Sequence, residues 1–197
     1  MDPYLARLAA LLGDRDPIVT LRATPARLDA AAADPRTDWN APWRPGGWTG
    51  REIVAHLSDQ EIGFSFRARQ AVAAAALARE ADAADGEGSD AEASHAEGSG
   101  TDGAQAGRPR PLHVAQPYDQ DAWARAYSRM DPALAIASFG ALRAWNLAWL
   151  ARLELADWLA SYHHPERDET ETVDELVRFL AGHDLNHLAQ LDAIVAG

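Results

Sequence analysis

The sequence predicts an all-α protein, an up-and-down four-helix bundle with short extra helices. Signals for helix starts recur along the chain, and between them apolar residues recur at spacings of three and four, as on the inward face of a bundle helix. No segment shows the sustained alternation of apolar and polar residues that a half-buried strand needs. A large sheet is therefore not expected.

The start signals are of two kinds, and they place the helices in order along the chain. Asp2-Pro3, Asp16-Pro17 and Asp131-Pro132 each combine a capping side chain with a proline that suits the first helical turn. Thr49–Glu52 and Thr172–Glu175 are capping-box patterns. Long helices are expected at residues 17–32, 50–79, 132–159 and 173–196, with shorter ones from residue 3 and from Gln120 to Arg129.

Residues 80–111 differ in composition from the rest of the chain. Between Glu80 and Gly107 the sequence has eight acidic residues, no Arg, and many Gly, Ala and Ser. Such a stretch cannot bury enough apolar surface to offset the entropy lost on ordering, so it predicts a disordered insertion. An acidic linker can recruit a partner, but we favour a solvating spacer. Residues 1–79 and 112–197 are then the two parts of a single helical-bundle domain.

Composition argues against several classes of function. The net charge of −12 argues against nucleic-acid binding, because phosphate contacts need a basic face. The chain has no cysteine, which rules out disulfides, thiolate metal ligands and a cysteine nucleophile. No signal peptide is visible, and no apolar run is long enough to span a membrane. We expect a cytoplasmic protein that binds neither nucleic acid nor a membrane.

Two histidines four residues apart, His183 and His187, mark the candidate functional site. At this spacing two helical side chains lie on one face, one turn apart, and two imidazoles can bind the same metal ion. Both histidines fall in the apolar stripe of the last helix, where a buried polar group needs a partner. Only ten residues follow His187, and none is His, Glu or Cys, so a third strong ligand has to come from an earlier helix.

His56, on the second long helix, is the best candidate for that third ligand. The other histidines fall in expected linkers, loops and the insertion. Taken alone, His56 also fits an ordinary core or surface histidine, and spacing alone leaves both interpretations open.

Three dispersed segments resemble the DinB/YfiT-like superfamily. They are Gly47–Glu61, Pro117–Trp123 and His164–Arg167, and they occur in the family's order. The resemblance implies a four-helix bundle that binds one divalent metal ion through three histidines, which map to His56, His183 and His187. The family includes bacillithiol S-transferases, mycothiol-dependent isomerases and proteins described as metal-dependent hydrolases, and its members are often dimers.

Three further residues are expected to contact substrate. Gln60 lies one turn after the histidine of the second helix, on the same face, so it can line the pocket. The resemblance suggests that the segment with Tyr118 and Asp119 covers the mouth of the site, although Asp119 also fits a helix cap. Arg67 and Arg143 can meet an anionic substrate, but we expect both to form surface ion pairs.

A metal ion held by three protein nitrogens keeps open positions, which is the pattern of a catalytic site. Imidazole suits several metals, and we expect zinc or nickel. The function we expect is transfer of a low-molecular-weight, bacillithiol-like thiol to an electrophilic substrate. Hydrolysis by an activated water is the first alternative, and a non-catalytic metal-binding or stress-response protein is the second. By resemblance, we expect a homodimer.

Overall fold

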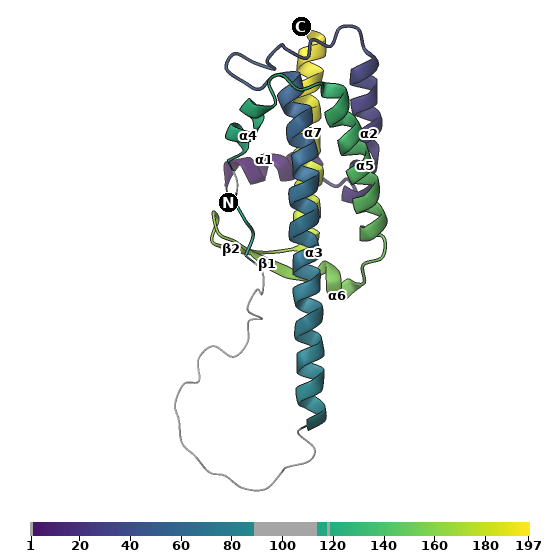
Figure 1. Ribbon diagram of the computed structural model, residues 1–197, viewed down its shortest axis with the longest axis vertical. Helices are drawn as coiled ribbons and strands as arrows, with labels where there is room; N and C mark the ends of the chain where they lie inside the picture. The colour runs from purple at the N-terminus through teal and green to yellow at the C-terminus, as the bar shows by residue number, and fades with distance from the viewer. Residues whose placement is uncertain (1, 89–113, 118) are drawn as a thin grey trace.

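The computed structural model describes residues 2–88, 114–117 and 119–197. The elements are α1 (Pro3–Leu12), α2 (Pro17–Ala33), α3 (Gly50–Gly88), α4 (Gln120–Ala126), α5 (Pro132–Leu150), α6 (Leu155–Trp158), β1 (Ser161–His164), β2 (Glu169–Thr172) and α7 (Val173–Ala196). The four long helices, α2, α3, α5 and α7, form a bundle, and the shorter α1 and α4 lie along one side of it (Figure 1). The prediction of an all-α four-helix bundle is confirmed.

The predicted helix starts are confirmed by their caps. The carboxylates of Asp2, Asp16 and Asp131 accept hydrogen bonds from backbone N–H groups in the first turns of α1, α2 and α5, at 2.8, 3.0 and 2.9 Å. Thr172 forms the capping box with Glu175 at the start of α7. Each cap satisfies an N–H group that the helix itself leaves unpaired, which typically stabilises a helix by about 1 kcal/mol.

Two predicted helices end earlier than expected. The helix predicted over residues 132–159 is α5, which ends at Leu150, and the helix predicted to reach Arg129 is α4, which ends at Ala126. After α5 the chain starts a new short helix, α6, with a capping box between Glu154 and Asp157. The apolar residues continue across this break, so their spacing did not reveal it.

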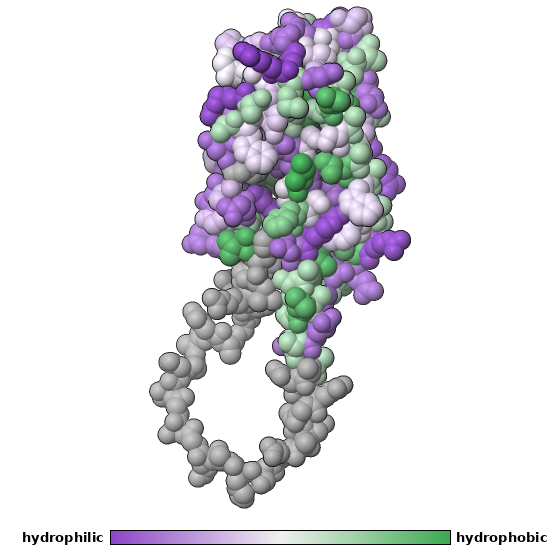
Figure 2. Space-filling model, viewed as in Figure 1, coloured by the Kyte–Doolittle hydropathy of each residue, from purple (hydrophilic) through white to green (hydrophobic). Residues whose placement is uncertain are grey.

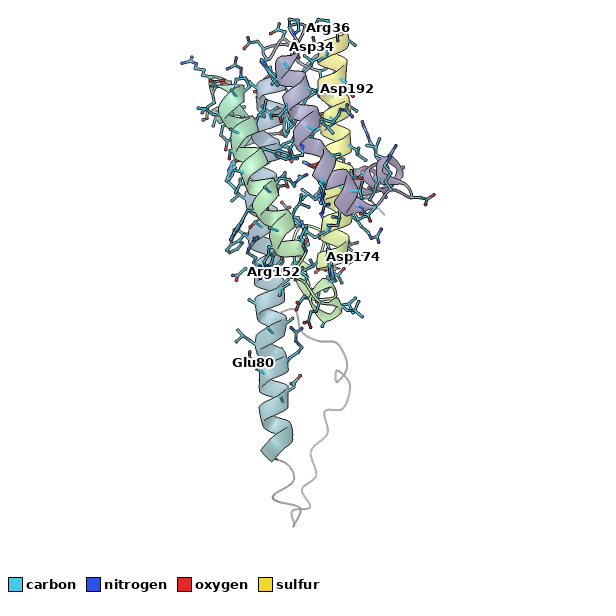
Figure 3. The ribbon with its side chains drawn as sticks, turned by 90° about the vertical axis from the view of Figure 1, so that its right-hand side faces the viewer. Asp34, Arg36, Glu80, Arg152, Asp174 and Asp192 are labelled. Carbon is cyan, nitrogen blue, oxygen red and sulfur yellow. The ribbon has the colours of Figure 1, made fainter. Side chains whose placement is uncertain are left out.

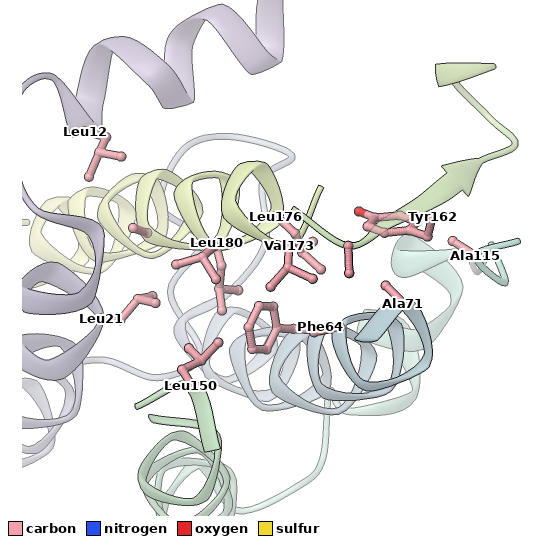
Figure 4. Packing of buried hydrophobic residues seen from close by; sticks show 14 residues of the cluster. Leu12, Leu21, Phe64, Ala71, Ala115, Leu150, Tyr162, Val173, Leu176 and Leu180 are labelled. Atoms are coloured by element: carbon pink, nitrogen blue, oxygen red, sulfur yellow. The ribbon is translucent and has the colours of Figure 1, made fainter. Parts of the chain in front are cut away.

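A two-stranded hairpin joins α6 to α7, where the sequence predicts a loop. β1 and β2 pair antiparallel, from Ser161 opposite Thr172 to His164 opposite Glu169. Strands of four residues are too short to show the alternation that identifies a strand in a sequence. The hairpin buries Tyr162 against the lower end of the bundle (Figure 4).

Helix α3 continues to Gly88, past its predicted end at residue 79. Residues 80–88, the first part of the expected insertion, are therefore helical. Figure 1 shows α3 projecting beyond the other helices, and Figure 3 shows Glu80 on the projecting part. The alanine-rich sequence explains the extension, because Ala has the highest helix propensity. Residues 89–111 of the expected insertion lie outside the described residues.

The helix directions depart from strict up-and-down alternation. Ser58 of α3 is hydrogen-bonded to Ser138 of α5, and Arg69, further along α3, is hydrogen-bonded to Asn146, further along α5. The two helices α3 and α5 therefore run in the same direction. Helices α2 and α3 each pack against both α5 and α7, which places these two consecutive helices diagonally across the bundle. The long connection between α3 and α5 makes this order feasible, because it returns the chain to the end of the bundle where α3 begins.

The core consists of two apolar clusters with a polar layer between them. Figure 4 shows the lower cluster, which includes Leu21, Phe64, Leu150, Leu176 and Leu180. The upper cluster includes Leu28, Leu57, Phe139, Leu188 and Leu191. Each of the four bundle helices contributes to one cluster, then to the polar layer, then to the other cluster. The polar layer comprises the buried residues Thr24, His56, Glu61, Arg143, Asn146, His183, Asp184 and His187.

Within the described parts of the chain, α5 is the one helix long and apolar enough to cross a membrane by length and composition. It packs against α2 and α3, and its buried face contributes Arg143 and Asn146 to the polar layer. These contacts account for α5 as a helix of the bundle.

Candidate metal centre

The structure brings the three predicted histidines together in the polar layer. His56 comes from α3, and His183 and His187 come from successive turns of α7. The Nε2 atom of His183 lies 2.9 Å from Nε2 of His56 and 3.1 Å from Nε2 of His187. All three side chains are buried: His56 and His183 are 2% exposed, and His187 is 5% exposed.

Hydrogen bonding alone does not satisfy these three nitrogens. The Nε2 atom of a neutral imidazole has one position in the ring plane, where it either donates or accepts a hydrogen bond. His183 Nε2 has two neighbouring nitrogens and can pair with only one of them. A shared cation would accept all three lone pairs, and metal–nitrogen bonds of about 2.0–2.1 Å place the nitrogens roughly 3.0–3.4 Å apart. The residues present therefore fit a metal ion.

The second ring nitrogen of His187 is held by Gln190, three residues further along α7. The Nδ1 atom of His187 lies 2.8 Å from Oε1 of Gln190. When Nδ1 donates this hydrogen bond, the lone pair of Nε2 is left facing the other histidines, as in many metal sites. The sequence interpretation missed Gln190, although the three-residue spacing from His187 is a signal that can identify such a partner.

Burial sets the protonation state of the cluster. It lowers the pKa of His56 and His183 well below the usual 6.5, and it lowers the pKa of His187 to about 4. Charge on neighbouring histidines lowers the pKa of His56 and His183 further, whereas the Gln190 hydrogen bond works to raise that of His187. At neutral pH the three imidazoles are therefore neutral rather than positively charged, and the neutral imidazole is the form that binds a metal ion.

Aromatic rings border the cluster. The Trp48 ring meets the His56 ring edge-on at 4.7 Å between centroids and lies parallel to the His187 ring at 6.0 Å. Phe179 lies 5.7 Å from the His183 ring. The indole N–H of Trp48 donates to Asp121 of α4 at 3.1 Å, which ties α4 to this side of the site. These rings lower the local polarity beside the cluster.

Arg143 occupies the centre of the polar layer, so the prediction that it forms a surface ion pair is wrong. It is 1% exposed, and its guanidinium lies over the Phe139 ring. It donates to Oε1 of Glu61 at 2.7 and 3.0 Å and to Oδ2 of Asp184 at 2.7 Å. Both carboxylates are fully buried. The packing of the helices around Arg143 keeps its side chain away from solvent.

Hydrogen bonds from Asn146, also on α5, and from Thr24 on α2 complete this network. Asn146 donates to Oε2 of Glu61 at 2.9 Å, and Thr24 donates to Oδ2 of Asp184 at 2.7 Å. Burial works to lower the pKa of Arg143, but the two carboxylates outweigh it, so this pKa is raised above its ordinary value. Burial raises the pKa of Asp184 against the opposing effects of Arg143 and Thr24.

The sequence interpretation missed Glu61 because a single glutamate in a helix ordinarily faces solvent. A signal was present, since Glu61 occupies an inward position of the stripe that runs through Leu57 and Phe64. An acidic residue at such a position requires a buried cationic partner, and Arg143 provides it.

The three residues predicted to contact substrate have different positions. Gln60 is half-buried on α3, one turn after His56. Asp119 is exposed and caps α4 by accepting a hydrogen bond from the Ala122 N–H at 2.9 Å. Tyr118 lies outside the described residues. Substrate contact by these residues stays a prediction.

The fold and the site together define a four-helix-bundle protein with a buried three-histidine centre suited to a metal ion. The chain belongs to the DinB superfamily, whose sequence model matches residues 20–191. The matched region contains His56, His183 and His187, and it includes the whole polar layer.

Two relatives of this chain come from Bacillus. A protein of Bacillus pumilus (strain SAFR-032), described as "Putative metal-dependent hydrolase", is 22% identical over 178 residues, which span 90% of this chain and 75% of the relative. The solved structure of YfiT from Bacillus subtilis has a TM-score of 0.67 and 21% identity, and the match spans 90% of this chain and 83% of that one. Its description reads "a probable metal-dependent hydrolase with an unusual four-helix bundle topology". At this level of identity the structural likeness supports the fold alone.

Proposed function

We propose that this protein is a metal-dependent enzyme that binds one divalent ion, zinc or nickel, through His56, His183 and His187. The observation that carries the proposal is the convergence of the Nε2 atoms of three buried, neutral imidazoles on one point. The descriptions of the relatives from Bacillus as metal-dependent hydrolases support the same class. Small molecules are the substrates that such a centre fits.

The reaction we propose is transfer of a low-molecular-weight, bacillithiol-like thiol to an electrophilic substrate. A divalent metal with open positions acts as a Lewis acid and lowers the pKa of a thiol or water that binds it. Trp48 and Phe179 give the centre an aromatic border, which suits the apolar carbon atoms beside a thiol group. Hydrolysis is the second candidate, because the relatives' descriptions name it.

Gln60, Tyr118 and Asp119 are the residues we propose to contact substrate. Gln60 follows His56 by one turn on α3. Asp119 stands at the start of α4, and the hydrogen bond from Trp48 to Asp121 brings that helix to the edge of the centre. A polar group at each position can orient a substrate that reaches the metal from the α4 side.

Activity assays on metal-reloaded protein test the reaction class. Metal-free protein receives one equivalent of Zn²⁺ or Ni²⁺ and is then assayed with bacillithiol and a bimane acceptor, or with ester and amide substrates in the absence of thiol. We expect turnover that requires both metal and thiol. Turnover without thiol would instead establish the hydrolase, and inactivity in both assays would leave a non-catalytic metal protein.

Two histidine variants make that assay specific for the site. His183→Ala removes the ligand that contacts both other imidazoles, and we expect it to abolish activity. His163→Ala, in β1 and outside the cluster, is the matched control and should retain activity. Full activity of the His183→Ala protein would remove the histidine site from the mechanism.

We also propose a cytoplasmic homodimer that pairs through the outer faces of α3 and α5. Leu134, Trp145, Ile62 and Phe66 on these helices are 63%, 66%, 53% and 54% exposed. Figure 2 shows hydrophobic residues gathered along this face of the molecule. Exposed apolar surface of this extent is typical of an interface. Residues 132–150 carry no charged side chain besides the buried Arg143, so α5 brings no like-charge repulsion to the pairing.

The dimensions of this face suit a dimer. α5 is about 28 Å long, and two adjacent helices present a face roughly 20 Å wide, which gives about 1,100 Å² over both protomers, close to the minimum for a specific interface. Light scattering tests it with Trp145→Glu, which should give monomers. Leu155→Glu changes an apolar residue on α6 that is more exposed than Trp145, and it should leave the dimer intact. A wild-type protein that is monomeric at micromolar concentration would refute the interface.

A further inference from the structure

Arg143 links the two helices that carry the histidines. Its guanidinium donates to Glu61 on α3, five residues after His56, and to Asp184 on α7, next to His183. We propose that Glu61, Arg143 and Asp184 are positioning residues of the metal centre. They hold α3 against α7 at the spacing where the α3 histidine meets the α7 pair, and this role rests on the proposed metal binding.

The place of the network in the core argues for positioning rather than stability. Buried ion pairs seldom stabilise a protein more than apolar residues of the same volume, because the charges lose their hydration. The clusters above and below show that apolar side chains fill this bundle well. Among the buried residues that the structure describes, charged side chains occur only in the polar layer, at the level of the histidines. Their geometry is directional, since one planar guanidinium fixes two carboxylates at once.

The charge of the network also suits a cation. Three neutral imidazoles bring no negative charge to a divalent ion in a buried site. Two carboxylates and one guanidinium leave one net negative charge beside them. The Oδ1 atom of Asp184 is buried and has no hydrogen-bond partner among the described residues, so part of this charge is not neutralised by hydrogen bonds. Carboxylates placed around metal ligands commonly strengthen metal binding in this way.

Cobalt binding tests the proposal in two nearly isosteric variants. Glu61→Gln and Asp184→Asn each keep the shape and one acceptor oxygen of the side chain but remove its charge. Metal-free proteins are titrated with Co²⁺, whose visible absorption reports the coordination geometry. We expect the Kd for Co²⁺ to rise roughly 10–100-fold in both variants, with a changed spectrum. The matched control is Asp192→Asn, an exposed carboxylate on α7 that pairs with Arg27, and its Kd should stay at the wild-type value.

A third variant covers the case in which a single change unbalances the core. Glu61→Gln combined with Arg143→Met and Asp184→Asn removes every charge of the network together, so no charge is left unpaired, and the same weakening is expected. Folded variants with the wild-type Kd and spectrum would overturn the positioning role and leave a purely structural network. If the wild-type protein itself fails to bind Co²⁺, the proposed metal function fails, and the positioning role fails with it.

Discussion

The polar layer and the apolar cluster below it both draw on the same four long helices but have different roles. The lower cluster is made of Leu, Phe, Val and Ala side chains together with Tyr162, and their burial drives folding. The polar layer places three imidazoles, two carboxylates and a guanidinium in the same bundle, and their desolvation opposes folding. The difference indicates that stability comes chiefly from the apolar clusters, whereas the polar layer is retained for what it binds.

The largest effect is expected from breaking the polar layer. Arg143→Met leaves the carboxylates of Glu61 and Asp184 buried without their cation, which should lower the free energy of unfolding by about 3–5 kcal/mol. Urea denaturation measures this. Arg27→Met removes the exposed pair with Asp192 and should change stability by less than about 1 kcal/mol. Equal effects of the two substitutions would contradict the comparison.

A change in the apolar cluster should separate stability from metal binding. Leu176→Ala opens a cavity two turns before His183, so the free energy of unfolding should fall by about 2–5 kcal/mol. The folded fraction should still bind one metal ion per chain with the wild-type Kd. A Kd weakened tenfold in this variant would show that the two regions are not independent.

A smaller effect is expected where α1 crosses α7. A Cβ atom on Gly182 would lie 2.5 Å from the backbone oxygen of Leu8, and this oxygen cannot move without the rest of α1. Gly182→Ala should therefore displace α1 and cost about 1–3 kcal/mol. Gly140→Ala on α5 has open space around the added methyl group and is the matched control. Equal melting temperatures of the two variants would rule out the close crossing.

A gradual effect is expected from pH in the metal-free protein. The pKa of His187 is lowered from 6.5 to about 4 in the folded state, so the unfolded chain binds this proton first as the pH falls. Stability from the neutral imidazole is complete above pH 6.5 and is lost between 6.5 and about 4. Urea midpoints measured across this window should fall steadily, and less steeply for His187→Gln. A flat profile in the wild-type protein would mean that the cluster is not buried as described.

The helices and their apolar faces could be predicted from the sequence, because caps and the spacing of apolar residues are local signals. Asp16 and Thr172 begin helices where their patterns indicate, and the spacing of His183 and His187 places both on one face. The histidine of α3 needed the family resemblance in addition, since no local rule pairs residues 127 positions apart.

The network of the polar layer could not be predicted from the sequence, because it depends on contacts between helices. Arg143 resembles a surface arginine until its partners on α3 and α7 are known. Trp48 directly precedes the Thr49–Glu52 capping box in the sequence, and its place beside the His56 ring follows only from the packing of the bundle. The parallel direction of α3 and α5 likewise depends on the path between them, which carries no apolar pattern.

Metal analysis of protein purified without an affinity tag or a nickel column tests the central claim most directly. We predict one zinc or nickel ion per wild-type chain and none in the variant His183→Ala combined with His187→Ala, with both proteins folded by circular dichroism. A wild-type protein without stoichiometric metal, whose melting temperature is unchanged by added Zn²⁺ or Ni²⁺, would contradict the account.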